Sequence, residues 1–290
     1  SCSGNHNFRK LIMGINCSSF SKINIGLKIL GQRKDGFHNI NTIFQELQFG
    51  DTISIEKSDQ GCNITSDVNW IPNDKSNFCY NAYEELVKKF PDIDGVKIII
   101  NKNVPVGSGL GGGSANAAAV LKGICKLFDL GISNNELKEI ALNIGADVPF
   151  FINGGTQLGK GIGEILKPIN NPIEGFYLLV IPNISISTEW AYSQIKNKLN
   201  SEETLTNFAG FSGGKNFSPE LFENDFERVV IPTYPEIGSI KEKLIEFGAM
   251  FASLSGSGST VYGIFSDDSS AEEAELFFQD SNMTILTEPT

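Results

Sequence analysis

From Ser21 onward, short apolar runs alternate with polar turns, a pattern typical of β-strands. The predicted strands cover residues 22–30, 42–50 and 51–56, with a polar turn over residues 31–39. Apolar side chains at helical spacing then predict a helix over residues 77–90, and the apolar run 96–100 predicts the next strand. The first part of the chain is therefore expected to be rich in β-strands, with helices added.

The second half has the same mixed pattern. A buried strand is predicted over residues 176–181, an amphipathic helix over 235–247, two strands around a glycine turn within 251–265, and a closing helix and strand. A polar, glycine-rich loop is expected at 200–218, and the composition changes near 154–163. We therefore expect an α+β protein with a tail (1–12), an N-terminal domain (13–158) and a C-terminal domain (159–290).

The richest chemical signal is the run 103–119, in which five glycines lie between Gly107 and Gly113. Glycine lets backbone N–H groups turn toward a ligand without a Cβ in the way. An alanine-rich helix predicted from Ser114 adds the unpaired N–H groups and positive dipole of its first turn. Together these features predict a phosphate-binding loop.

Two familiar phosphate loops do not fit this segment. A Walker A loop needs a lysine after its last glycine, but Gly113 and Ser114 follow Gly112. The spacing Gly107-x-Gly109-x-x-Gly112 matches the dinucleotide fingerprint, which requires a strand after the helix. Here a second helix follows, with a capping box from Ser133 to Glu136 and a stop at Gly145. The chain therefore has a different kind of phosphate loop.

The net charge, the length of the apolar runs and the spacing of the cysteines argue against several classes of function. The formal net charge of the 290 residues is -11, which argues against a nucleic-acid-binding surface. No apolar run is long enough to cross a bilayer. The five cysteines are scattered without a Cys-x-x-Cys pair, so neither a zinc site nor a disulfide framework is indicated. We expect a cytoplasmic protein with reduced thiols and no membrane or nucleic-acid partner.

Three segments together resemble the GHMP kinases, a family of ATP-dependent small-molecule kinases. They are the glycine loop, the segment Gly145–Phe151 (GADVPFF) and the glycine turn within 253–265. Residues 22–47, 50–56, 145–166 and 224–227 further resemble a branch of this family whose substrate carries a cytidine diphosphate group. The resemblance runs from about Ser21 to Phe265. Its departures are Phe37, where tyrosine is common, and Ser259, where proline is frequent.

The resemblance implies an ATP-binding N-terminal domain related to domain 2 of ribosomal protein S5. It also implies a ferredoxin-like, substrate-binding C-terminal domain, with the active site between the two. The implied reaction is direct phosphoryl transfer from ATP, with Mg²⁺, to an alcohol of the cytidyl substrate. A monomer or weak homodimer is expected.

The implied catalytic residues are Lys22 and Asp147. Alone, Asp147 would be taken for a solvated cap after a helix, and Lys22 for a surface lysine. The resemblance makes Asp147 the base that accepts the proton of the attacking hydroxyl. It places Lys22 beside Asp147 and the γ-phosphate, where its charge would keep Asp147 ionised.

The resemblance also implies contacts to each ligand. For the substrate, His38 would read the cytosine, Phe37 and Tyr192 would stack on its faces, and Asn24 and Thr188 would contact the rest. Without the resemblance, Tyr192 would be taken for a core aromatic. The nucleotide set is Asn77, Lys102, Pro105, Val106, Gly107, Ser108, Gly109, Leu110, Gly111, Gly112, Gly113, Ser114 and Ala115, with Ser114 a candidate Mg²⁺ or phosphate contact. Ser255, Gly256 and Gly258 would close the phosphate end, or form a purely structural turn.

Two other functions remain open from the sequence. The chain could be a GHMP kinase for a different alcohol, such as mevalonate, homoserine or a sugar. It could also be a non-catalytic ligand-binding protein with the same fold. Phe37, His38 and Tyr192 argue against the first, because a small acid or sugar needs no base-stacking pair. Lys22, Asp147 and both glycine segments argue against the second.

Overall fold

The computed structural model describes residues 14–169, 173–195 and 221–290, which fold around two β-sheets. The predicted tail (1–12) and the predicted loop (200–218) lie outside the described residues. Within the described ranges, no helix is both long and apolar enough to cross a membrane.

The first sheet holds six strands. They are β1 (Gly14–Gln32), β2 (His38–Ser58), β3 (Cys62–Ser66), β4 (Gly95–Asn101), β5 (Thr156–Gly161) and β6 (Ile165–Pro168). Their order is β3-β4-β2-β5-β6, and β1 pairs antiparallel with β2. The β-rich opening is confirmed, although β1 begins at Gly14, eight residues before Lys22, the predicted start of the first strand.

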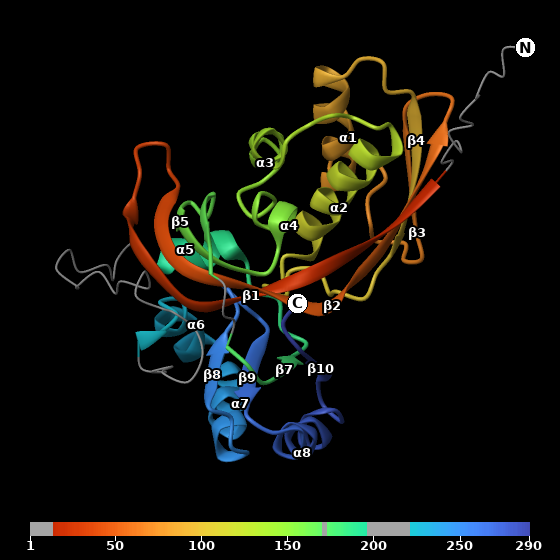
Figure 1. Ribbon diagram of the computed structural model, residues 1–290. Coiled ribbons are helices and arrows are strands. Elements are labelled where there is room, and N and C mark those ends of the chain that lie inside the picture. The colour runs from red at the N-terminus through yellow and green to blue at the C-terminus, as the bar shows by residue number, and fades with distance from the viewer. Residues whose placement is uncertain (1–13, 170–172, 196–220) are drawn as a thin grey trace, which may run out of the picture.

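The β1–β2 ribbon is long and bent, as Figure 1 shows. Its register shifts at Phe20/Ser21, at Ile25/Leu27 and at Ile29/Gly31. Each extra residue in a bulge bends the strand and re-aims the neighbouring side chains. Lys22 and Asn24 lie between the first two shifts, so this irregular stretch of β1 sets where both side chains point.

Four helices cover one face of this sheet: α1 (Phe78–Lys89), α2 (Gly112–Leu127), α3 (Asn134–Leu142) and α4 (Phe150–Asn153). Isoleucines of β2 and β4 pack against the alanines of α2, which allow the helix to approach the sheet closely. The predicted helix at 77–90, the strand at 96–100 and the Ser133–Glu136 capping box are confirmed.

The second sheet has the order β10-β7-β9-β8, with every pair antiparallel. Its strands are β7 (Phe176–Ile181), β8 (Phe251–Leu254), β9 (Val261–Phe265) and β10 (Met283–Thr287). The helices are α5 (Thr188–Ile195), α6 (Glu227–Thr233), α7 (Pro235–Glu246) and α8 (Asp268–Phe278). Strand, helices, two strands, helix and strand in this order make the predicted ferredoxin-like domain.

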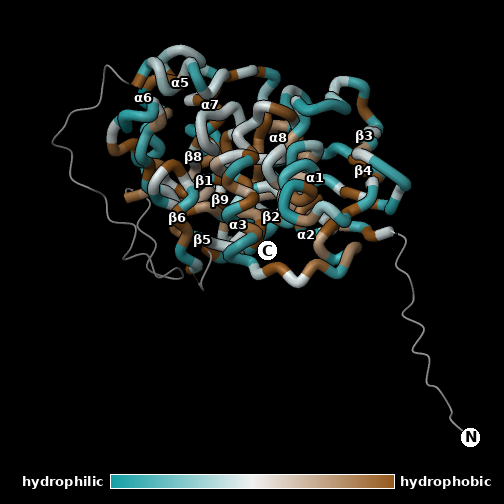
Figure 2. Tube along the Cα trace, turned by 90° about the horizontal axis from the view of Figure 1, so that it is seen from above, coloured by the Kyte–Doolittle hydropathy of each residue, from teal (hydrophilic) through white to brown (hydrophobic). Residues whose placement is uncertain are grey.

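The two sheets meet in a shared core. Ile23, Ile25 and Ile43 of the β1–β2 ribbon pack with Tyr177 and Tyr262 of the second sheet. In Figure 1, α1–α4 lie above this ribbon, and the second sheet lies below it with α7 and α8. Hydrophobic and hydrophilic segments alternate along the tube in Figure 2, as expected when each element buries one face.

The division between the sheets lies beyond the predicted domain boundary at residue 159. That residue is within β5, which pairs with β2, and β6 extends the same sheet to Pro168. The second sheet starts at Phe176. The glycine-rich composition near 154–163 therefore marks a hairpin inside the first sheet.

Candidate active site

The glycine loop joins β4 to α2, and its backbone conformation favours glycine at several positions. Gly107, Gly109 and Gly111 have φ values of +69°, +81° and +71°, a region that other residues rarely adopt. A Cβ on Gly109 would also lie 2.2 Å from the carbonyl oxygen of Ser255. The loop is therefore shaped by its glycines and by close contact with a distant segment.

Helix α2 begins at Gly112, two residues before the predicted start at Ser114. Gly111 adopts a left-handed conformation just before the helix, and its carbonyl accepts a hydrogen bond from the backbone N–H of Ala115 at 2.9 Å. Gly112, Gly113 and Ser114 consequently form the first turn of α2. Unpaired backbone N–H groups of such a turn favour anions such as phosphate.

The C-terminal glycine turn, defined as residues 255–259, packs directly on the glycine loop. The Ser255 hydroxyl donates to the Gly109 carbonyl at 3.0 Å, and the backbone N–H of Thr260 donates to the Ser108 carbonyl at 3.1 Å. The predicted contact between the two glycine segments is therefore confirmed, although 146 residues separate Gly109 from Ser255.

Lys22 is buried beside this loop, on β1. Its Nζ donates to the Asn24 Oδ1 at 2.8 Å and to the Gly109 carbonyl at 3.0 Å, and it lies 3.8 Å from the Asp147 Oδ2. Burial lowers the pKa of Lys22, and the nearby Asp147 carboxylate partly opposes this effect. The structure thus brings the two predicted catalytic side chains together at the glycine loop.

Asp147 lies in the turn between α3 and α4, ahead of Pro149. The backbone N–H of Val148 donates to the Gly145 carbonyl at 3.1 Å, which closes the turn. The side chain of Asp147 is 37% exposed, whereas that of Lys22 is 5% exposed. The Asp147 carboxylate is therefore accessible to a ligand. The Lys22 ammonium group, which lies 3.8 Å away, is buried in the protein.

An aromatic pair lies near this centre. The rings of His38 and Tyr192 stack with centroids 4.8 Å apart and an angle of 17° between the planes, and Phe226 meets Tyr192 edge-on. Burial, reinforced by the Asp147 carboxylate, raises the pKa of Tyr192 to about 12. Phe37 is 57% exposed. The structure thus brings His38 and Tyr192 together, with Phe37 outside the pair.

The other two predicted substrate contacts, Asn24 and Thr188, are hydrogen-bonded to Lys22 and to the C-terminal glycine turn, respectively. Asn24 accepts from Lys22, and its Nδ2 donates to the Thr42 hydroxyl at 3.0 Å. Thr188, the first residue of α5, shares a 2.8 Å hydrogen bond with the Ser257 hydroxyl. Thr188 therefore links the helix that carries Tyr192 to the C-terminal glycine turn.

Asn77 and Lys102 make structural contacts at the edge of the loop. Asn77 caps α1 by accepting from the backbone N–H of Cys79 at 2.8 Å. Lys102 forms a buried ion pair with Asp51, whose other oxygen accepts from the backbone N–H groups of Asn103 and Val104 at 2.7 and 2.9 Å. Asp51, for which no sequence pattern predicted a role, thereby anchors the start of the glycine loop.

The remaining loop positions differ in exposure. Val106 is 70% exposed, Leu110 is fully buried, and Ser108 donates from its hydroxyl to the Pro105 carbonyl at 2.8 Å. Within the part of the chain that the structure describes, no group of three or more histidine, cysteine, aspartate or glutamate side chains could hold a metal ion. The first turn of α2 contains one residue with a hydroxyl group, Ser114.

Family models and relatives agree with this geometry. The model of the GHMP kinases N terminal domain matches residues 77–155, and the GHMP kinases C terminal model matches residues 211–282. A 4-diphosphocytidyl-2-C-methyl-D-erythritol kinase of Clostridium botulinum (strain Loch Maree / Type A3) is 41% identical over 85% of this chain and 89% of its own length. One from Gloeobacter violaceus is 37% identical over 87% of this chain and 86% of its own length.

Solved structures show the same similarity. A crystal structure of 4-(cytidine 5'-diphospho)-2C-methyl-D-erythritol kinase matches with a TM-score of 0.78 and 25% identity, over 95% of this chain and 99% of that one. A homoserine kinase from Cytophaga hutchinsonii shares the fold, with a TM-score of 0.69 and 18% identity over 99% of this chain and 97% of its own. The chain therefore belongs to the 4-diphosphocytidyl-2-C-methyl-D-erythritol kinase family, within the GHMP kinases.

Proposed function

We propose that this protein transfers the γ-phosphoryl group of ATP to the 2-hydroxyl of 4-diphosphocytidyl-2-C-methyl-D-erythritol. The observation that carries the proposal is the position of Asp147. Its carboxylate lies 3.8 Å from the Lys22 ammonium group at the glycine loop and acts electrostatically on Tyr192 of the aromatic pair. One acidic group thus connects a phosphate-binding region with a surface suited to a nucleobase.

The proposed chemistry is a direct displacement at phosphorus. The substrate hydroxyl oxygen attacks the γ-phosphorus, the bond from that phosphorus to the bridging oxygen breaks, and ADP leaves with the bonding electrons. The hydroxyl proton passes to Asp147. The positive charge of Lys22 offsets negative charge in the transition state, and the backbone N–H groups of the first turn of α2 hold the phosphates.

The donor set suits Mg²⁺ that arrives with the nucleotide. Mg²⁺ is usually bound by one or two protein oxygens together with substrate phosphates and water, and it reduces the repulsion between the phosphates. Ser114 supplies a hydroxyl in the first turn of α2, and Asp147 supplies a carboxylate 3.8 Å from the Lys22 Nζ. We propose Ser114 as the protein contact of the ion or of the phosphate beside it.

The aromatic pair is the proposed site for the cytosine. Stacking uses the faces of aromatic rings, and the exposed Phe37 can supply a further face next to His38. The ring edge of His38 would supply hydrogen bonding to the base. We propose that Tyr192 supports the orientation of His38 and that the pair discriminates cytosine from other bases.

An ATP-consumption assay with a panel of alcohols tests this function. The purified protein should form ADP with the cytidyl substrate and not with mevalonate, homoserine or galactose. Turnover of one of these three instead would support a different GHMP kinase. ATP binding without turnover of any panel member would support a non-catalytic protein.

Base recognition gives a separable prediction. Replacing Tyr192 by alanine should raise the KM for the cytidyl substrate by roughly 5–150-fold, because His38 would lose the ring it stacks on, and a misoriented His38 would leave a polar group of the base unpaired at a cost of about 1–3 kcal/mol. The KM for ATP should stay nearly unchanged. Tyr192→Phe is the matched control, since it keeps the ring and should remain close to the unmodified protein. Steady-state kinetics with each substrate varied in turn would measure both constants.

A uridyl analogue of the substrate tests the hydrogen bonding of His38. Uracil has a carbonyl where cytosine has an amino group, so a mismatch would leave buried polar groups unpaired at a cost of about 1–3 kcal/mol each. The unmodified protein should therefore use the uridyl analogue poorly. Equal kcat/KM for the two compounds would remove the base-reading role from His38.

The lowered pKa of Lys22 predicts a pH effect. Lys22 must carry its positive charge to act, and it loses that charge as the pH rises through its pKa. The alkaline decline of kcat/KM, which reports groups of the free protein, should therefore begin below the range of an ordinary lysine. Lys22→Arg should abolish this decline, even at a lower rate, because arginine stays protonated. A decline unchanged in this variant would assign it to another group.

A further inference from the structure

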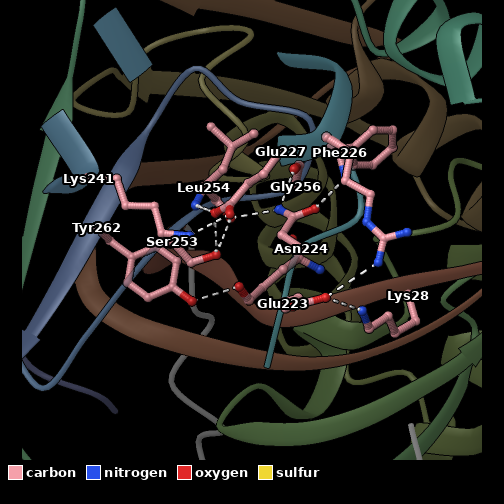
Figure 3. Close-up of polar contacts among 12 residues, drawn as sticks. Lys28, Glu223, Asn224, Phe226, Glu227, Lys241, Ser253, Leu254, Gly256 and Tyr262 are labelled. Atoms are coloured by element: carbon pink, nitrogen blue, oxygen red, sulfur yellow. Dashed lines mark hydrogen bonds and ion pairs between the residues drawn. The ribbon is translucent and has the colours of Figure 1, made fainter. Parts of the chain in front are cut away.

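Residues 223–227, which we call the brace, lie just ahead of and within the start of α6, and Figure 3 labels four of them, Glu223, Asn224, Phe226 and Glu227. The segment includes the NDFE run of residues 224–227. None of its residues is among the predicted catalytic or binding residues. Its side chains nonetheless reach the C-terminal glycine turn, and its backbone contacts β1.

Asn224 makes the most direct contact with the turn. Its side chain is buried, and its Nδ2 donates to two carbonyl oxygens, those of Leu254 and Gly256, each at 2.8 Å. Its Oδ1 accepts from the backbone N–H of Phe226 at 3.0 Å (Figure 3). The Asn224 amide therefore bonds both to the last residue of β8, Leu254, and to the second residue of the turn, Gly256.

Glu227 secures the strand that leads into the turn. Its Oε1 accepts from the Ser253 hydroxyl and from the backbone N–H of Leu254, both at 2.9 Å. Its other oxygen pairs with Lys241 of α7 at 2.5 Å. The carboxylate therefore fixes the end of β8 to two helices.

The backbone of the brace holds β1 on its other side. The Leu27 N–H donates to the Glu223 carbonyl at 3.0 Å, and the Asp225 N–H donates to the Leu27 carbonyl at 2.8 Å. The Asp225 carboxylate also accepts from the Ile29 N–H at 2.8 Å. The brace therefore connects the strand that carries Lys22 with the turn that covers Gly109.

We propose that Asn224 is a positioning residue for phosphoryl transfer, which sets the C-terminal glycine turn against Gly109 and Lys22. Gly256 and Gly258 have φ values of +57° and +98° and carry no side chain that could anchor the turn. A Cβ built on Gly256 would lie 3.7 Å from the Lys22 Nζ and 3.4 Å from the Asn24 Oδ1. A shift of Gly256 would therefore change the surroundings of the Lys22 and Asn24 side chains. The inference rests on the proposed kinase function.

Asn224→Asp tests the proposal with almost no change in size. Aspartate retains an oxygen that can accept from the Phe226 N–H, so the contact of Phe226 with Tyr192 is preserved. Its second oxygen cannot donate and would face the carbonyls of Leu254 and Gly256. The kcat should fall about 10–100-fold, because displacements near 1 Å can cost that much, while the KM for the cytidyl substrate stays within about twofold.

Asn282→Asp is the matched control. Asn282 also donates from Nδ2 to a backbone carbonyl, that of Phe278 at 3.4 Å, but at the end of α8. It should leave both kinetic constants unchanged. Thermal unfolding and circular dichroism would establish the folded fraction, so that kcat is expressed per folded molecule. A purely structural role would lower the melting temperature and leave that kcat intact.

A kcat of folded Asn224→Asp within twofold of the unmodified protein overturns the proposal. If this variant does not fold, Asn224→Ser decides, because a hydroxyl can donate one of the two lost bonds without adding a charge. Its kcat per folded molecule should fall about 3–30-fold below that of the unmodified protein, because one of the two bonds is kept, and an unchanged kcat is again the contrary result. Should the unmodified protein prefer another alcohol, the same ratios are measured on that alcohol, so that the two proposals fail separately.

Discussion

Asp147→Asn is expected to lower kcat about 10²–10⁴-fold with little change in KM for either substrate. Asparagine has nearly the same shape as aspartate but cannot accept the proton of the attacking hydroxyl. It also removes the negative charge that lies 3.8 Å from the Lys22 ammonium group. Since both effects act mainly in the transition state, steady-state kinetics should show a loss in kcat alone.

Asp92→Asn is a suitable control for this experiment, because Asp92 is an exposed aspartate in the turn after α1. The control should keep normal kinetics, and both variants should unfold at similar temperatures. A near-normal kcat in Asp147→Asn would remove the residue from the mechanism. A large rise in KM without loss of kcat would give it a binding role instead.

Gly109→Ala is expected to lower kcat/KM for ATP by about 10²-fold. The alanine Cβ would lie 2.2 Å from the Ser255 carbonyl oxygen, so the loop or the turn must move by about 1 Å, enough for a loss of this size. The left-handed backbone at Gly109 adds about 1–2 kcal/mol of strain for a residue with a Cβ. Kinetics and calorimetric titration with ATP would measure the loss.

Gly131→Ala provides the matched control for Gly109→Ala. Gly131 lies outside the site, has no heavy atom within 4 Å of a built Cβ, and does not adopt a left-handed backbone. This control should bind ATP normally. Normal ATP affinity and turnover in Gly109→Ala would show that the glycine loop does not position the nucleotide.

Gly112→Val tests another glycine of the same loop. The structure changes the reason for which this substitution is expected to weaken ATP binding. From the sequence alone, a side chain here would occupy the space of the phosphates. In the structure, a built Cβ at Gly112 first meets Val104 Cγ1 at 2.9 Å. Weaker ATP binding is still expected, because α2 must shift away from Val104, and titration of the folded variant would measure it.

Local patterns were sufficient to predict most elements. The apolar run at Phe176–Ile181, the Ser133–Glu136 capping box and the helix from Pro235 are features whose stabilising contacts lie within a few residues. The glycine loop could be recognised for the same reason, because the glycines that permit its backbone conformation lie within the loop itself. The pairing of Lys22 with Asp147 came from the resemblance and not from their spacing.

Features that depend on distant contacts could not be read from the pattern. Nothing near Asn224 indicates that its amide would bond to Leu254 and Gly256, thirty or more residues away. The stacking of His38 on Tyr192 likewise depends on how α5 packs against the start of β2. The NDFE run was the available signal for the brace, but without its partners it suggested no role.

The proposed reaction is tested most directly by the position of the phosphate in the product. The 2-carbon of the substrate carries a methyl group and no hydrogen, so a phosphate on its oxygen has no three-bond coupling to a proton. After incubation with ATP and the cytidyl substrate, phosphorus-31 NMR should therefore show a new phosphomonoester singlet together with ADP. A proton-coupled phosphomonoester signal, which places the phosphate on another hydroxyl, or no new phosphomonoester at all would contradict the proposed reaction.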